Sequence, residues 1–205
     1  MVDGAAPGSL LYDGRRCTIR TLTESDVASL FLLPNVSLAL SRYRPGLGGT
    51  PQAGSNAIER MRLLRQFEPP VEIEALVLHR ASGAPIGLLC LSSIDRLNLK
   101  AEFSVAFFRG RGTRCALEAI HWALETTFGP GGAEKLVFYT EPDNRPALAL
   151  MHALQIDREA VLSREIRLSS GRRGDVWRYA LFRESWQAGV GRRELSRLVP
   201  LAESA

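Results

Sequence analysis

The sequence predicts a single mixed α+β domain built on one sheet. Several short apolar segments are bounded by turn residues, which is typical of strands. Other segments place apolar residues three and four positions apart, which is the spacing of one helical face. Helices come early, and a strand meander, a strand–helix–strand–helix unit and a closing hairpin follow. A length of 205 residues fits one domain with one core.

The first third of the chain predicts one strand and two helices. Residues 1–15 show no period, and we expect a loose leader there. CTIRTL, residues 17–22, predicts a short strand, and Thr23 then predicts the N-cap of a helix. Residues 44–56 are rich in Gly and Pro and predict a loop. A second helix is expected over about 55–67 before a Pro-Pro pair ends it.

The middle of the chain predicts three strands and a helix. Residues 71–78 and 86–94 flank the turn ASGAP, and residues 101–108 form the next strand. A helix follows RGRGT, and its polar positions fall on one face: Arg114, Glu118, His121 and Glu125. The opposite face is predicted to be the buried one and carries Ala116, Ala119, Ile120 and Ala123.

The last third predicts one more strand, one helix and a hairpin. These elements cover residues 135–140, 144–154, 161–168 and 176–182. We therefore expect a domain over 16–187 and a tail, 188–205, that holds one short helix.

Composition argues against several classes of protein. The net charge of +4 comes from 26 basic and 22 acidic residues that are spread along the chain, which argues against a nucleic-acid partner. The chain has no apolar run of the roughly 18 residues that cross a bilayer, and it has no signal-peptide pattern, so we expect a cytoplasmic protein without a membrane partner. Cys17, Cys90 and Cys115 are far apart and odd in number, which predicts reduced core thiols.

The segment from Phe107 to Arg114 carries the strongest chemical signal. A strand ends, two glycines follow and a helix begins. Gly110 and Gly112 allow a positive φ and close approach of a ligand, and the first amides of a helix are donors without helical partners. Arginines at 109, 111 and 114 add positive charge. The segment predicts a phosphate or diphosphate site, with a tight turn carrying solvated arginines as the alternative.

These segments, in this order, resemble the GNAT family of N-acetyltransferases, in particular the branch of ribosomal-protein N-terminal acetyltransferases. The family's phosphate motif reads Arg109-Gly110-Arg111-Gly112-Thr113-Arg114 here. Further resemblances lie between residues 11 and 187, in CTIRTLTESD, IGLLCLSSID, AEFSVAF, EPDNRPALALMHAL and GDVWRYALFRESW. The resemblance implies a mostly antiparallel, twisted sheet with helices on both faces. It also implies acetyl-CoA as co-substrate, no metal, and a primary amine, on a small molecule or a protein N-terminus, as acceptor.

The resemblance further implies where the acetyl donor binds. The donor would lie along the strand at Val105, Ala106 and Phe107, and its diphosphate on residues 109–114. A strand N–H near Val105 or Ala106 would stabilise negative charge on the thioester oxygen. Asn144 would hydrogen-bond the pantetheine or diphosphate arm, and capping of the next helix is a further role for it.

Glu102 is the first candidate for the base. Alternation places it with Ser104 on one face of the strand, where a carboxylate could take the amine proton directly or through water. A solvated glutamate or a partner for an arginine is the alternative. Tyr139 is a second candidate for proton handling, or else a core residue.

Three departures from the family pattern are present, and the first two support a rival function. Met151 stands where many relatives have a tyrosine, Ala147 where the ribosomal-protein branch often has a serine, and Gln155 where a glycine is usual. A non-catalytic acyl-CoA-binding module is therefore the alternative to an enzyme. An exposed edge strand also leaves a homodimer open.

Overall fold

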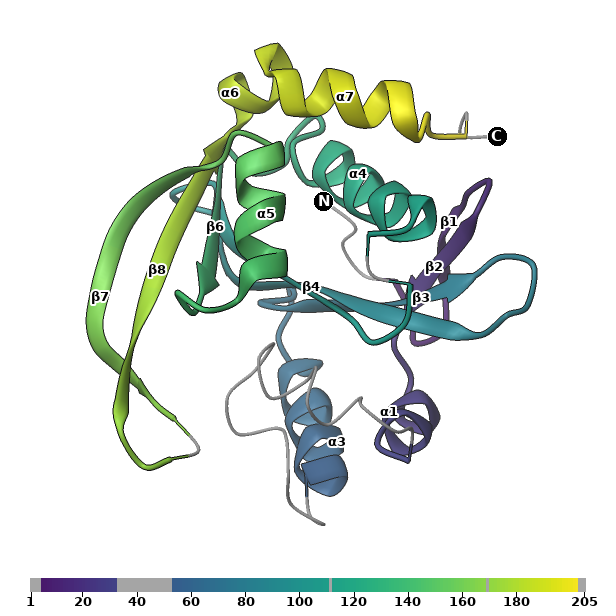
Figure 1. The fold of residues 1–205 in the computed structure, drawn as a ribbon. Coiled ribbons are helices and arrows are strands. Elements are labelled where there is room, and N and C mark those ends of the chain that lie inside the picture. The colour runs from purple at the N-terminus through teal and green to yellow at the C-terminus, as the bar shows by residue number, and fades with distance from the viewer. Residues whose placement is uncertain (1–4, 33–52, 111, 169, 203–205) are drawn as a thin grey trace.

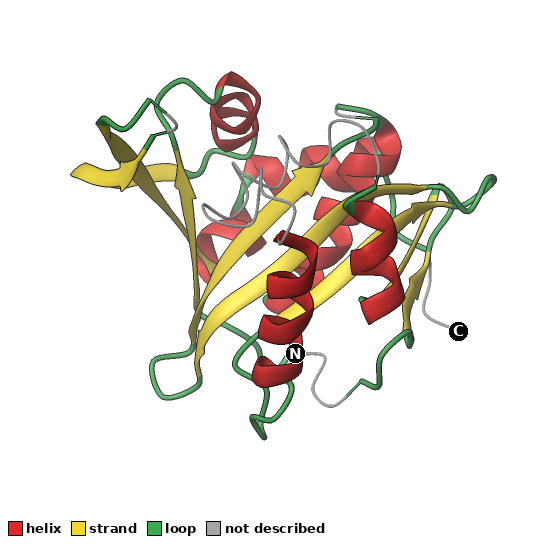
Figure 2. Cartoon of the chain, turned by 90° about the horizontal axis from the view of Figure 1, so that it is seen from below, coloured by secondary structure: helices red, strands yellow, loops and turns green. Residues whose placement is uncertain are grey.

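Eight strands form one twisted sheet that crosses the molecule (Figures 1 and 2). The computed structural model describes residues 5–32, 53–110, 112–168 and 170–202, with the backbone alone at 53–54. The strands lie in the order β1-β2-β3-β4-β5-β6-β8-β7. Only β5 and β6 run parallel among these described neighbours, so the sheet is mixed and mostly antiparallel, as predicted. The strands are β1 Leu10–Asp13, β2 Cys17–Thr21, β3 Ile73–His79, β4 Pro85–Asp95, β5 Lys100–Phe107, β6 Lys135–Thr140, β7 Asp157–Arg167 and β8 Arg173–Phe182.

Helices cover both faces of the sheet (Figure 1). Side-chain alternation explains the two layers. Leu76 and Leu88 pack with Met61 beneath α1 and α3, whereas Phe103 belongs to the cluster beneath α4. The helices are α1 Glu24–Leu30, α3 Ala53–Leu64, α4 Arg114–Thr127, α5 Arg145–Ala153, α6 Arg183–Ala188 and α7 Val190–Leu198.

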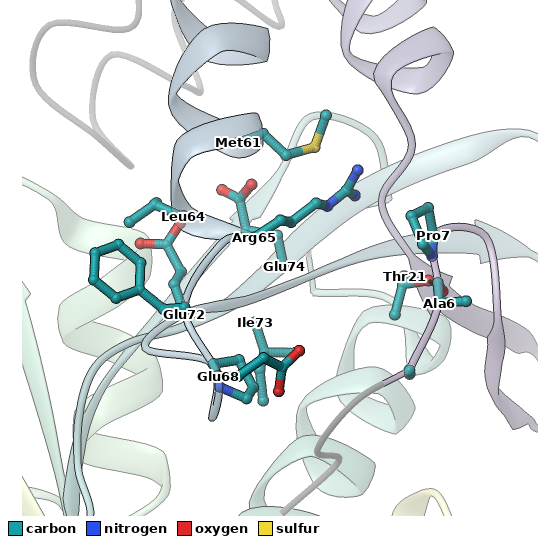
Figure 3. Close-up of a pocket in the computed structure, with 13 residues that line it drawn as sticks. Ala6, Pro7, Thr21, Met61, Leu64, Arg65, Glu68, Glu72, Ile73 and Glu74 are labelled. Atoms are coloured by element: carbon teal, nitrogen blue, oxygen red, sulfur yellow. Dashed lines mark hydrogen bonds between the residues drawn. The ribbon is translucent and has the colours of Figure 1, made fainter.

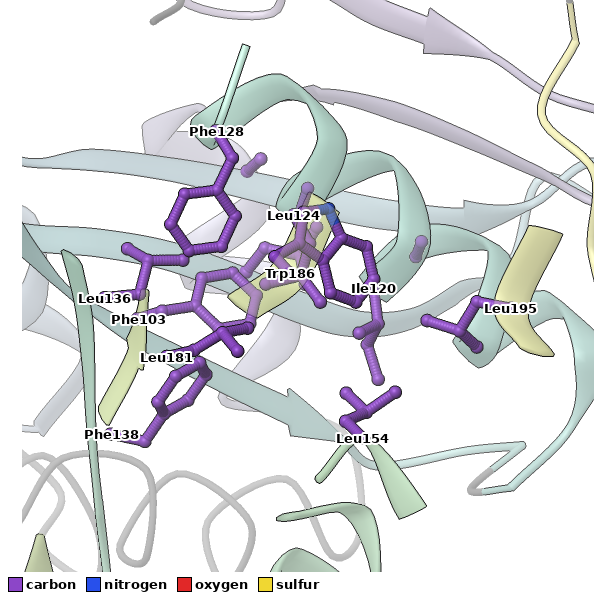
Figure 4. Close-up of a cluster of buried hydrophobic side chains, with 14 of the residues drawn as sticks. Phe103, Ile120, Leu124, Phe128, Leu136, Phe138, Leu154, Leu181, Trp186 and Leu195 are labelled. Atoms are coloured by element: carbon purple, nitrogen blue, oxygen red, sulfur yellow. The ribbon is translucent and has the colours of Figure 1, made fainter. Parts of the chain in front are cut away.

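The larger core cluster holds the frame of the site together (Figure 4). Phe103 of β5 meets Phe138 of β6 edge to face, with ring centroids 5.7 Å apart. Leu124 and Leu136 are fully buried between α4 and β6. Each such side chain contributes about 1.5–3 kcal/mol through burial. The cluster therefore fixes α4 against the two strands that run parallel.

Most predicted elements are present with small shifts at their ends. Thr23 caps α1 in a reciprocal box: its Oγ1 accepts from the Asp26 N–H at 3.2 Å, and Asp26 Oδ2 accepts from the Thr23 N–H at 2.8 Å. The helix expected over about 55–67 runs from Ala53 to Leu64. Residues 44–52 of the predicted loop lie outside the described residues, and the rest of that loop belongs to α3.

The predicted leader and tail are wrong as domain limits. Leu10–Asp13 of the expected leader forms β1 and pairs with β2, and Tyr12 stacks on Trp122 with ring centroids 5.7 Å apart. The expected tail contains its predicted helix, α7, but Leu195 and Val199 are buried in the main core. Strand β1 and helix α7 therefore belong to the folded domain.

The polar face predicted for α4 is also corrected. Glu118 is fully buried and His121 is 3 % exposed. His121 Nδ1 lies 2.9 Å from the carbonyl oxygen of Val199, so the C-terminal segment covers this side of the helix. Tyr12 hydroxyl donates to Glu118 Oε1 at 3.4 Å from the N-terminal side. Helical spacing alone could not show that distant segments cover both faces of α4.

Candidate active site

The parallel strands β5 and β6 pair over a short length only. Their register joins Lys100 to Lys135, Ala101 to Leu136 and Glu102 to Val137. Strand β5 continues to Phe107 in its antiparallel pairing with β4. In such a pairing every second residue directs its N–H and C=O away from the neighbour. The second half of β5 therefore presents backbone hydrogen-bonding groups on its β6 side beyond the last β5–β6 pair.

The segment after β5 has the backbone expected of an anion-binding loop. Gly110 has φ +63° and Gly112 has φ +70°, values that favour glycine. A Cβ atom on Gly112 would meet nothing within 4 Å, so the position is open to a ligand. Thr113 caps α4: its Oγ1 accepts from the Ala116 N–H at 3.4 Å and donates to the Gly110 carbonyl at 2.6 Å.

Positive charge surrounds this helix N-terminus. The amides of Arg114 and Cys115 begin α4 and have no partner four residues earlier within the helix. Arg109, Gly112 and Arg114 are exposed. Arg111, which was predicted to join them, lies outside the described residues. The geometry suits a phosphate or diphosphate, because amide donors and the helix dipole act on the same point.

A cavity of about 280 Å³ adjoins this loop. Arg16, which precedes β2, and His79, at the end of β3, line it together with the first turn of α4. Sequence analysis did not select Arg16 or His79. No sequence pattern marks either residue, because only the order of strands in the sheet brings them next to Gly110 and the first turn of α4.

Glu102 lies on the face of the sheet that α1 and α3 cover. Cross-strand pairs place Ser92 beside Glu102, and Glu74 beside Cys90 in the next row. Glu72 lies two residues before Glu74 and therefore shares its face. Glu102 thus shares its sheet face with two further carboxylates, with β4 between them. Sequence analysis missed these two because the register of β3 decides their side.

A second cavity, of about 270 Å³, opens beside these carboxylates (Figure 3). Glu68, Glu72 and Glu74 line it, together with Arg65 at the end of α3. Arg60 pairs with Glu72 through two bonds, Nη1–Oε1 at 2.7 Å and Nη2–Oε2 at 2.6 Å. Arg65 and the Arg60 paired with Glu72 offset two of the three carboxylates, so the wall keeps one net negative charge.

Tyr139 is 43 % exposed, so the alternative of a core role for it is wrong, and its role in proton handling stays a prediction. The adjacent Phe138 enters the main core instead, which turns Tyr139 to the opposite face. Val137, which pairs with Glu102, shares that face with Tyr139. Glu102 and Tyr139 therefore lie on one side of the sheet, on the two strands whose pairing ends early.

Comparison with known proteins identifies the family. The acetyltransferase (GNAT) domain family matches residues 16–156. The chain belongs to this family. No curated protein sequence matches it. A GCN5-related N-acetyltransferase from Brucella melitensis superposes with a TM-score of 0.74 at 16 % identity, covering 97 % of this chain and 89 % of that one. A Vibrio cholerae spermidine/spermine N-acetyltransferase, crystallised with manganese, has a TM-score of 0.66 at 21 % identity, covering 84 % of this chain and 95 % of that one.

Three residues at α5 and directly after it, in this GNAT chain, bear on the sequence predictions. Asn144 occupies the N-cap of α5 without a side-chain capping bond, so capping was the wrong role for it. Met151 is 5 % exposed and packs in the main core. Gln155 has φ +54°, and its N–H donates to the His152 carbonyl at 3.1 Å. The glycine usual there would relieve this left-handed backbone.

The cysteines of the GNAT domain are buried, as predicted. Burial raises the pKa of the Cys115 thiol, and the neighbouring Glu118 carboxylate raises it further. Burial and Glu118 also raise the pKa of Cys17. Neither thiol is therefore suited to nucleophilic attack at neutral pH.

Among the described residues, one cluster of side chains has the spacing of metal ligands. The side-chain ligand atoms of Glu72, Glu74 and Cys90 lie within 4.8 Å of one another. Arg60 already neutralises Glu72, so this group does not carry a metal assignment. The absence of a metal stays a prediction. In the described part of the chain, the helices are too short or too polar to span a membrane.

Proposed function

We propose that this acyltransferase moves an acetyl group from acetyl-CoA to a primary amine. The observation that carries the proposal is the glycine loop at the start of α4, whose backbone geometry suits an anion, together with the early end of β5–β6 pairing. A long donor with a diphosphate at one end of its arm and a thioester at the other needs both features. The amides and arginines of residues 109–114 would hold the diphosphate, and the strand segment Val105–Phe107 would line the arm.

Residues of this chain supply the remaining chemistry. A β5 amide near Val105 or Ala106 would donate to the thioester oxygen as negative charge develops there. Glu102 would take the proton of the attacking amine, and Tyr139, on the same face, would assist proton transfer. The Asn144 amide would bind the donor arm. The amine attacks the thioester carbonyl directly in a ternary complex, the C–S bond breaks, and coenzyme A leaves as a thiolate that takes up a proton. An acyl-enzyme is not part of this proposal, because the buried thiols of Cys17 and Cys115 have raised pKa values.

For the acceptor we propose a class of amine and not a single compound. The acidic wall of Glu68, Glu72 and Glu74 supports an acceptor that carries positive charge. A protein N-terminus, as in the ribosomal-protein branch, and a small amine both meet this condition. A cytoplasmic location and a homodimer remain predictions.

The first test is calorimetric binding of acetyl-CoA to the full chain. Gly112→Asp adds a carboxylate at the open position of the loop, and Gly112→Asn is the neutral, isosteric control for the same left-handed backbone. One added like charge near a phosphate is expected to weaken binding about 30- to 150-fold, or roughly 2–3 kcal/mol. The Asn variant should stay close to the unmodified protein. Equal binding by the two variants would refute the diphosphate assignment.

Turnover separates the enzyme from the rival binding module. Glu102→Gln should keep acetyl-CoA affinity and lower kcat about 10²- to 10⁴-fold on an amine panel. The buried Met151 in place of a tyrosine keeps the rival open. Binding by the unmodified protein without turnover on small amines and peptides would favour the non-catalytic module.

A further inference from the structure

We infer that Arg16 binds the 3′-phosphate of the donor's ribose and so selects coenzyme A over its dephospho form. The inference rests on the proposed function, because it assumes an acetyl-CoA donor. The observation behind it is the cavity of about 280 Å³ that Arg16 lines together with residues of the diphosphate loop.

The cavity continues the diphosphate site toward β2 and β3. Its loop wall consists of Gly110, Thr113 and Arg114, which belong to the proposed diphosphate site. The rest of its lining is Arg16, His79, Ile86 and Cys115. A group that enters it must therefore lie within reach of a bound diphosphate. In coenzyme A the ribose 3′-phosphate is the second anionic group, and one ribose separates it from the diphosphate.

Arg16 is held in place by α4 rather than by solvent. Its Nη1 donates to Glu118 Oε2 at 3.2 Å, and its backbone N–H donates to Glu118 Oε1 at 3.2 Å. Its carbonyl accepts from Cys115 Sγ at 3.2 Å and from the Arg80 N–H at 2.9 Å. Glu118 is fully buried, whereas the Arg16 side chain is 32 % exposed. Glu118 thus holds the Arg16 guanidinium in place, and the partly exposed Arg16 side chain lines the cavity.

The close approach of Glu118 depends on Gly14. A Cβ atom at that glycine would lie 2.1 Å from Glu118 Oε1. Fixing a guanidinium in advance lowers the entropy lost on binding, and its five donors suit a phosphate monoester. The nearby charges also favour a dianion, because Arg114 lines the same cavity at the positive end of the α4 dipole. The buried Glu118 offsets one of these charges.

The test compares coenzyme A with dephospho-coenzyme A by calorimetry on the full chain. The unmodified protein should bind coenzyme A about tenfold more tightly or better, as expected for a charge-assisted hydrogen bond. Arg16→Gln should lose this preference while its affinity for the dephospho form stays within about twofold. Arg15→Gln is the matched control, because Arg15 is an exposed neighbour with the same charge that does not line the cavity.

Each outcome bears on one of the two proposals. Equal affinity of the unmodified protein for both ligands would overturn the Arg16 assignment and leave the proposed function standing. Equal weakening of both ligands by Arg16→Gln would also overturn it, by placing Arg16 on the diphosphate. Binding of neither ligand would overturn the proposed function itself. If Arg16→Gln does not fold, the comparison on the unmodified protein still decides the preference, and Arg16→Lys should retain part of it.

Discussion

Replacing Glu125 by Gln should loosen the C-terminal helix from α4, and the effect should disappear at low pH. Arg192 Nε lies 2.5 Å from Glu125 Oε1, and Arg192 Nη2 lies 3.0 Å from Oε2. His121 Nε2 lies 3.7 Å from the same Oε1. Burial alone would raise the pKa of Glu125, but the bonds to His121 and Arg192 outweigh it and hold the pKa at about 2.

The magnitude follows from this pKa. A fall from 4.5 to about 2 corresponds to about 3.4 kcal/mol of stability at 1.36 kcal/mol per pKa unit. Glu125 is 26 % exposed and Arg192 is 41 % exposed, so solvent screens part of the pair. We therefore expect Glu125→Gln to cost about 1–2 kcal/mol at pH 7. Because the folded pKa is depressed, the contribution is complete above pH 4.5 and is lost as the pH falls toward 2.

Urea unfolding at pH 7 and at steps down to about pH 3 measures this difference, because the contribution is lost between pH 4.5 and about 2. Glu194→Gln is the matched control, because its ion pair with Arg197 is 49 % and 70 % exposed on the same helix, α7. That variant should change the free energy of unfolding by less than about 0.5 kcal/mol. A loss with Glu125→Gln that is no larger than the control, or that does not shrink on acidification, would refute the reasoning.

Three further predictions concern stability and proton transfer. Gln155→Gly should raise Tm by about 2–4 °C in calorimetry, because glycine relieves a left-handed residue worth about 1 kcal/mol, whereas Gln155→Ala should give no gain. Glu118→Gln should lower the free energy of unfolding by about 1–3 kcal/mol in urea and reduce the preference for coenzyme A, because Arg16 loses its buried partner. Tyr139→Phe should keep acetyl-CoA affinity and lower kcat on the amine panel; unchanged kcat would remove the hydroxyl from proton transfer.

The sequence alone predicted the features that depend on neighbouring residues. The Thr23 capping box, the strand alternation at Glu102 and the glycine loop before α4 each follow from local backbone chemistry. The order of these segments along the chain resembles that of the GNAT family. The family match over residues 16–156 confirms the resemblance at the level of the family.

Tertiary structure alone decided which distant segments share a surface. Helical spacing assigned Glu118 to a polar, solvent-facing side of its helix. Tyr12 and Arg16, more than a hundred residues earlier in the chain, bind and cover it instead. Glu74 faces the same side as Glu102 only because β3, β4 and β5 pair in one register. Periodicity reports one element at a time, whereas burial and charge grouping are set by the packing of elements against one another. The loop that would hold the diphosphate was therefore predictable, but Arg16 and the acidic wall were not.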